Sequence, residues 1–190
     1  MIPPDDTPSP WARTSRTSVY ENAWITLFQD EVVRPDGKPG IYGVVHPRTH
    51  AVGVMALDDR DRLLLVGQYR YTLSRYSWEI PEGGVQIGDD ALEGARRELA
   101  EETGFRADTW RELMRFSLAN STSDETGVLY VATGLHPGTA DPDDTEDLEL
   151  RWVPFERSLE EVRSGELFDA MTQLGILRVA ADRATQQAES

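Results

Sequence analysis

The stretch GGVQIGDDALEGARRELAEETGF, residues 83–105, decides the fold of this chain. Its second part predicts a helix over 89–103, because apolar residues recur every three or four positions and Gly104 follows as a C-terminal stop. Asp89 suits the N-cap of this helix, and so does Asp90, which has a glutamate three positions further on. The glycines at the start of the stretch predict a loop that leads into the helix.

Three carboxylates share one face of this helix. At about 100° per residue, Glu98, Glu101 and Glu102 fall within an arc of about 100°. Like charges at this spacing repel, whereas hard divalent cations prefer such oxygen ligands. A solvated acidic face is the alternative that these residues leave open. Gly94 lies one turn before Glu98, where its missing side chain would leave room for the loop carrying Gly83 or for substrate.

Composition narrows the class of protein further. The chain has 190 residues, 39% of them hydrophobic and 28% charged, which predicts one globular domain. Its 34 acidic residues against 19 basic ones leave a formal charge of −15, and the only lysine is Lys38. A surface of this sign argues against nucleic-acid binding. A polyanionic substrate would therefore need metal ions or a few local arginines.

Neither a thiol nor a membrane segment is visible in the sequence. The absence of cysteine excludes disulfides, thiolate zinc sites and cysteine nucleophiles. The first dozen residues lack the basic and apolar parts of a secretory signal, and no apolar run approaches the length that spans a membrane. We expect a cytoplasmic protein with no membrane partner.

The rest of the chain predicts an α/β sandwich. Residues 1–16 read as a flexible arm, and residues 17–185 as a single domain. An N-terminal β-hairpin extension is expected at about 17–47, around a Pro-Gly turn at 34–40. Six acidic residues within 141–149 predict a solvated loop. Further strands are predicted at 51–57 and 62–68, paired around a polar turn, and at 78–80, 111–118, 127–133 and 148–155; further helices at 159–164 and 167–184.

Gly83 and the run Arg97-Glu98-Leu99-Ala100-Glu101-Glu102-Thr103-Gly104-Phe105 resemble the Nudix box. One position departs from that pattern, where Asp89 stands in place of the first glutamate. The resemblance implies an α/β/α Nudix sandwich with a mixed β-sheet and an N-terminal antiparallel extension. It also implies a site for Mg²⁺ or Mn²⁺.

The same resemblance implies roles for individual residues of the box. Glu98 and Glu102 would bind the metal, with Glu101 as a further or water-mediated ligand and a possible activator of water. The backbone carbonyl of Glu82 would be another ligand. Arg97 would orient the carboxylates through an ion pair and so assist catalysis.

The resemblance extends from about residue 18 to 177, to bacterial Nudix hydrolases of the ADP-ribose and nucleoside diphosphate sugar pyrophosphatase type. It is carried by residues 19–25, 33–37, 68–71 and 78–84. It implies hydrolysis of ADP-ribose or an NDP-sugar to a nucleoside monophosphate and a sugar phosphate, by a homodimer. A nucleoside triphosphate or RNA-cap pyrophosphatase and a non-catalytic nucleotide-sugar sensor are the alternatives.

Three residues outside the box are expected to bind substrate. Arg70 can offer a forked guanidinium to a phosphate, or form a surface ion pair. Glu79 can contact metal-bound water or a ribose, or pair with a nearby arginine. Trp24 can stack on a base, although packing at a strand or dimer contact is the commoner role.

The catalytic base is expected on the loop at 120–127, which is the only acid-bearing loop between the box helix and the next apolar strand. Glu125 is the preferred residue, for water activation or metal contact, and Asp124 comes second. A plain turn acid is the alternative. His46 and His50 have no acid near them in the sequence and are expected to flank a turn at the surface.

Overall fold

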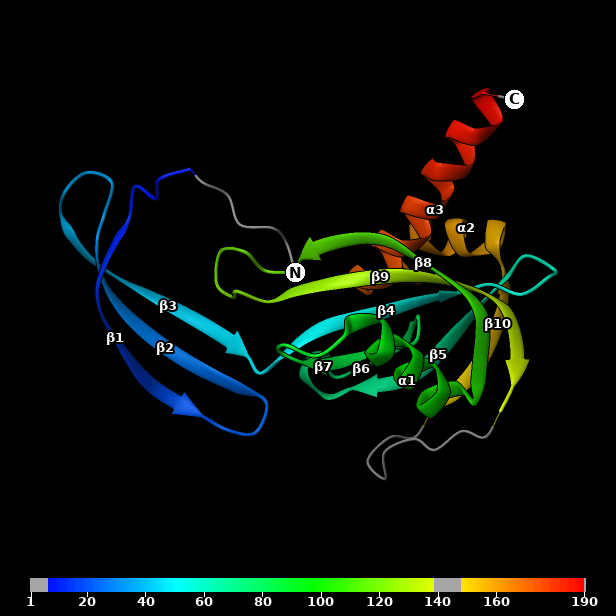
Figure 1. Ribbon diagram of the computed structural model, residues 1–190, viewed down its shortest axis with the longest axis horizontal. Helices are drawn as coiled ribbons and strands as arrows, with labels where there is room; N and C mark the ends of the chain where they lie inside the picture. Colours follow the sequence, from blue (N-terminus) through cyan, green and yellow to red (C-terminus); the bar gives the residue numbers. More distant parts are fainter. Residues whose placement is uncertain (1–6, 139–147, 190) are drawn as a thin grey trace.

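The computed structural model describes residues 7–138 and 148–189. Its first part is an antiparallel sheet in the order β1-β2-β3, made of β1 (Ala12–Glu21), β2 (Ile25–Val33) and β3 (Pro39–Pro47). Figure 1 shows this sheet standing to one side of the remaining elements. The predicted extension is therefore present, but it has three strands.

The sequence missed the third strand for a local reason. The side chain of Asn22 accepts the backbone N–H groups of Trp24 and Ile25, both at 2.8 Å, and so turns the chain inside one β-rich run. Because β1 begins at Ala12, the prediction of a flexible arm over 1–16 is wrong for residues 12–16. Residues 1–6 lie outside the described part of the chain.

Seven strands form the body of the domain in two sheets. The larger sheet has the order β7-β4-β9-β8 and the smaller one β10-β5-β6. Strand β4 pairs parallel with β9 and antiparallel with β7, so the sheet is mixed as predicted. The strands are β4 (Thr49–Ala56), β5 (Arg62–Arg70), β6 (Arg75–Glu79), β7 (Glu82–Gln86), β8 (Phe105–Ser117), β9 (Thr126–Pro137) and β10 (Glu149–Pro154), with a 3-10 turn η1 (Tyr71–Leu73) after β5.

The predicted pairing of 51–57 with 62–68 is wrong. Both segments are strands, but β4 and β5 belong to different sheets, and only an isolated bridge between Leu57 and Leu63 links them. Each strand has an unbroken run of five buried residues, so this part of each strand is covered on both faces and cannot act as one side of an exposed hairpin. The acids at 141–147 lie outside the described residues.

Helices cover both sides of the strands. Helix α1 (Ala91–Thr103) packs on a cluster that includes Val52, Val54 and Val128. Helices α2 (Phe155–Ser164) and α3 (Ala170–Glu189) pack on the other cluster, around Met55 and Leu129. Figure 1 shows α1 and the α2–α3 pair on opposite sides of the strands, which confirms the α/β/α sandwich. Within the described ranges, no helix is long and apolar enough to cross a membrane.

Both ends of α1 follow from its sequence. Asp90 is the N-cap, because its carboxylate accepts the backbone N–H of Leu92 at 2.8 Å. Gly104 ends the helix in the left-handed region at φ 71°, where a glycine costs least. A Cβ at Gly94 would overlap the side chain of Val85 in β7. The helix therefore lies close to β7, the strand that also carries Gly83.

Candidate active site

The carboxylates of α1 meet the first residues of β7. The backbone N–H of Glu82 donates to Oε2 of Glu102 at 3.1 Å. A Cβ at Gly83 would collide with the carboxylate of Glu98, so any larger residue there would displace that carboxylate. Glu102 is buried and the side chain of Glu98 is 14% exposed, whereas that of Glu101 is 44% exposed. The two inner carboxylates thus converge on one short backbone segment.

Arg97 fixes these carboxylates from the solvent side. Its Nη2 donates to Oε1 of Glu98 at 2.7 Å and to the backbone carbonyl of Gly84 at 3.0 Å. Its Nε lies 3.4 Å from Oε2 of Glu101. The hydrogen bond to Glu98 raises the pKa of Arg97. This one guanidinium therefore ties two acids of α1 to β7 and offsets part of their mutual repulsion.

Arg70 and Glu79, both predicted to bind substrate, form an ion pair with each other. Nε of Arg70 lies 3.0 and 2.9 Å from the two carboxylate oxygens of Glu79, and its Nη2 lies 2.8 Å from Oε1 of Glu82. The side chain of Glu79 is only 3% exposed. Although burial lowers the pKa of Arg70, its contacts with Glu79 raise it by more. The ion-pair alternative for both residues is thus what the structure contains.

Asp169 joins this group, and no motif in the sequence indicated it. Carboxylate oxygens of Glu79, Glu82 and Asp169 lie within 4.8 Å of one another. The carboxylate of Asp169 also accepts the backbone N–H of Thr172 at 2.8 Å, at the start of α3. An acid preceding a helix is an ordinary capping signal, so only the tertiary fold reveals its place beside Glu82.

The residues present fit a hard divalent cation. Burial raises the pKa of Glu82 well above its usual range, and repulsion by Asp169 and Glu79 adds to the effect. Oε2 of Glu82 is buried without a hydrogen-bond partner among the described residues. The carboxylates of Glu98 and Glu102 lie beside the backbone of Glu82 and Gly83 in β7. Carboxylate oxygens of this kind are the ligands that Mg²⁺ and Mn²⁺ prefer.

A cavity of about 250 Å³ opens beside Gly83 and Gly84 of β7. Glu125 reaches it from the loop between β8 and β9, although it is remote from the box in sequence. Burial raises the pKa of Glu125, whose side chain is half-buried. The cavity is lined by Thr49, Ala51, Arg70, Glu82, Gly83, Gly84, Leu118, Glu125 and Met171.

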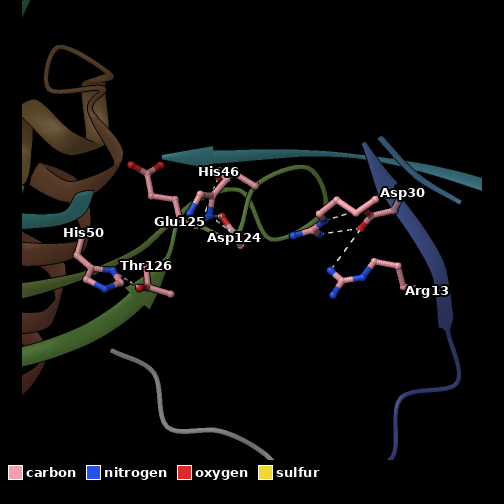
Figure 2. A network of polar contacts seen from close by, with 9 residues as sticks. Arg13, Asp30, His46, His50, Asp124, Glu125 and Thr126 are labelled. Carbon is pink, nitrogen blue, oxygen red and sulfur yellow. Dashed lines mark hydrogen bonds and ion pairs between the residues drawn. The ribbon is translucent and has the colours of Figure 1, made fainter. Parts of the chain in front are cut away.

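The prediction that His46 has no acidic neighbour is wrong in space. Its Nδ1 lies 2.8 and 3.0 Å from the two carboxylate oxygens of Asp124, which is 78 positions away in the chain. Nδ1 of His50 lies 3.0 Å from Oγ1 of Thr126 on the same loop. Figure 2 shows the carboxylate of Glu125 pointing away from both histidines.

Trp24 is not brought to the cavity within one chain. It lies on the turn between β1 and β2 and is 75% exposed, and it does not line the cavity that holds Arg70 and Glu125.

In this mixed-sheet sandwich, the glycine pair of β7 meets a helix with three clustered carboxylates, an arrangement suited to hold a divalent cation for hydrolysis of a phosphoric anhydride. Residues 47–170 match the NUDIX domain, and residues 11–45 match the nucleoside diphosphate sugar hydrolase N-terminal domain. The chain therefore belongs to the Nudix family and is a pyrophosphohydrolase. Nudix hydrolases use divalent metals, in agreement with the acidic residues gathered here.

Two of the similar proteins are named ADP-ribose pyrophosphatases. The ADP-ribose pyrophosphatase of Mycobacterium tuberculosis is 34% identical over 170 residues, which cover 88% of this chain and 82% of that protein. The ADP-ribose pyrophosphatase of Bacillus subtilis is 30% identical over 175 residues, covering 90% and 94%. A crystal structure of an ADP compounds hydrolase matches with a TM-score of 0.85 and 21% identity, over 96% of this chain and 98% of that one, and shows the same fold.

Proposed function

We propose that this chain hydrolyses the pyrophosphate bond of ADP-ribose or a related nucleoside diphosphate sugar, giving a nucleoside monophosphate and a sugar phosphate. The observation that carries the proposal is the nucleoside diphosphate sugar hydrolase N-terminal domain at residues 11–45, directly before the NUDIX domain. The names of the bacterial relatives, ADP-ribose pyrophosphatases, support the same substrate class.

The box residues would hold Mg²⁺ or Mn²⁺. Glu98, Glu102 and the backbone carbonyl of Glu82 would bind the ion, and Glu101, which is more exposed than Glu98 and Glu102, would act as a further or water-mediated ligand. The ion supplies positive charge to the diphosphate oxygens and makes water more acidic. Arg97 contacts both Glu98 and Glu101 and holds them beside Gly84 of β7.

Glu125 would take the proton from the attacking water. It lines the same cavity as Glu82 and Gly83, and the burial that raises its pKa makes it a stronger base than an exposed glutamate. Arg70 would contact a phosphate oxygen, exchanging part of its contact with Glu82 for the substrate. Glu79 would keep its ion pair with Arg70 and would contact metal-bound water or the substrate ribose.

A homodimer would complete the site through Trp24. Strand β1 is exposed along its whole length and, within the described residues, pairs only with β2. Exposed apolar side chains on this sheet include Val19 and Tyr20 of β1 and Ile41 of β3, which are 54%, 55% and 67% exposed. An open edge with apolar residues favours pairing with a second copy, which would place Trp24 of one subunit near the other's base-binding region. Sedimentation at micromolar concentration should give twice the chain mass, and a fully active monomer would refute the shared site.

A substrate panel tests the proposed activity directly. ADP-ribose, NDP-sugars, dinucleoside polyphosphates, nucleoside triphosphates and capped RNA would be incubated with Mg²⁺ or Mn²⁺, and products separated by chromatography. We expect kcat/KM to be highest for ADP-ribose or an NDP-sugar. Preference for a triphosphate or capped RNA would move the enzyme to that class, and binding without turnover would indicate a sensor. We place the enzyme in the cytoplasm with its nucleotide substrate, which cell fractionation would check.

A further inference from the structure

Strand β3 of the N-terminal sheet is joined to the loop that carries Glu125. The backbone N–H of Val45 donates to the carbonyl of Thr122 at 2.8 Å, and the N–H of Asp124 donates to the carbonyl of Val45 at 3.3 Å. The hydroxyl of Tyr42 donates to the carbonyl of Ser121 at 2.9 Å. The loop is therefore held against β3 through its backbone.

One side-chain contact completes this attachment next to Glu125. Nδ1 of His46 lies 2.8 and 3.0 Å from the oxygens of Asp124, as Figure 2 shows. An ionised carboxylate can only accept, so Nδ1 carries the proton in this contact. Asp124 immediately precedes Glu125, and Figure 2 shows their side chains pointing in different directions, with that of Asp124 directed toward His46.

The backbone around Glu125 is fixed from the other side as well. Its N–H donates to Oγ of Ser123, and its carbonyl accepts from Oγ of Ser117, both at 3.1 Å. With Asp124 held by His46, the peptide that carries Glu125 has few remaining ways to rotate. The His46–Asp124 contact adds a side-chain anchor to this loop directly before Glu125.

We propose that His46 is a positioning residue, which aims Glu125 into the cavity by holding Asp124 against β3. This proposal rests on the proposed role of Glu125 as the catalytic base. It assigns to the N-terminal sheet a part in catalysis within its own chain, separate from any contact with a second subunit. A misplacement of about 1 Å at a reacting group can cost on the order of 100-fold in rate, so a modest loop shift is enough to matter.

The variant His46→Ala tests the proposal in the full-length enzyme, with the substrate that the panel identifies. We expect kcat to fall about 10- to 100-fold while KM changes less than about threefold, because the base moves but the substrate contacts stay. His46→Gln, which keeps an N–H donor of similar reach, should recover part of the loss. A matched control is His136→Ala, which removes the other His–Asp contact, 3.5 Å from Asp108, away from the cavity.

A double-mutant cycle with Glu125→Gln separates the possible outcomes. If His46 acts through Glu125, then His46→Ala should cause almost no further loss in the Glu125→Gln background. Equal losses in both backgrounds, or a wild-type kcat for His46→Ala, would overturn the proposal. If Glu125→Gln alone keeps wild-type turnover, the role of Glu125 as base fails and the inference on His46 falls with it, whereas the substrate assignment stands.

Discussion

Arg70 of β5 and Glu79 of β6 face each other as a two-point ion pair, with Nε of Arg70 2.9 and 3.0 Å from the two carboxylate oxygens of Glu79. The pair lies beside the cavity that also contains Glu82. One guanidinium thus balances a dense group of carboxylates, and the site is strongly acidic without it. Substrate binding and protein stability are therefore coupled at this position.

Replacing Arg70 should weaken folding as well as activity. In Arg70→Ala, Glu79 and Glu82 lose their cation while Glu79 stays buried, so we expect a loss of about 2–4 kcal/mol. This lies toward the lower end for a buried pair, because the Arg70 side chain keeps 34% of its surface exposed. Urea unfolding measures the loss, with exposed Arg60→Ala in the β4–β5 turn as control. Equal stability of the two variants would show that solvent already screens the pair.

Neutralising a metal ligand should abolish activity without weakening the fold, unlike the Arg70 variant. Glu98→Gln and Glu102→Gln are each expected to abolish most turnover and to leave the melting temperature equal or slightly higher, because like-charge repulsion on α1 is relieved. Glu93→Gln, which changes an exposed acid paired with Arg96 on the same helix, is the control. The metal-site assignment is wrong if both ligand variants keep near wild-type kcat at saturating Mg²⁺.

The contact between Gly83 and Glu98 allows a steric test of the same site. In Gly83→Ala the new methyl would collide with the carboxylate of Glu98, so either the carboxylate or β7 must shift. We expect kcat to fall by at least about tenfold, with a higher Mg²⁺ concentration needed for half-maximal rate. Gly43→Ala on β3 is the control, because a Cβ there meets nothing within 4 Å. Unchanged metal dependence in Gly83→Ala would mean that Glu98 does not need its present position.

Sequence reasoning succeeded where the signal is local. The box helix and its three acids follow from spacing alone, whereas the sequence indicated only that Gly94 leaves room on the Glu98 face and did not identify Val85 of β7 as its neighbour. The shared face of Glu98 and Glu102 could be predicted because both lie on one helix. Their meeting with Glu82 was implied only by the resemblance, since it depends on how β7 packs against α1.

Sequence reasoning failed where contacts are long-range. Asp169 reaches Glu82 only because the start of α3 packs beside the end of β6, and His46 meets Asp124 only because β3 lies along the β8–β9 loop. Neither contact has a fixed spacing in the chain. The turn at Asn22 was missed for a different reason, since one side chain broke a run that otherwise has strand composition throughout.

The catalytic base gives the last prediction. Because burial raises the pKa of Glu125 above its ordinary value of 4.5, the residue stays protonated to a higher pH than an exposed glutamate. As a base it acts only when ionised, so kcat should fall on the acid side with an apparent pKa above 4.5. Glu125→Gln should lower kcat by about two to four decades with little change in KM, and should remove that acid limb.

The raised pKa of Glu125 should also make the stability of the folded protein depend on pH. As the pH rises, Glu125 loses its proton at a lower pH in the unfolded chain than in the folded one. The free energy of unfolding therefore decreases from about pH 4.5 upward, and the decrease is complete above the pKa of Glu125 in the folded protein. Glu125→Gln should therefore be more stable than wild type at neutral pH and equal to it below about pH 4.

Asp124→Asn should lower kcat less than Glu125→Gln, since Asp124 faces His46 instead of the cavity. The reverse ranking would move the base to Asp124, and two mild effects would leave water activation to the metal or to Glu101.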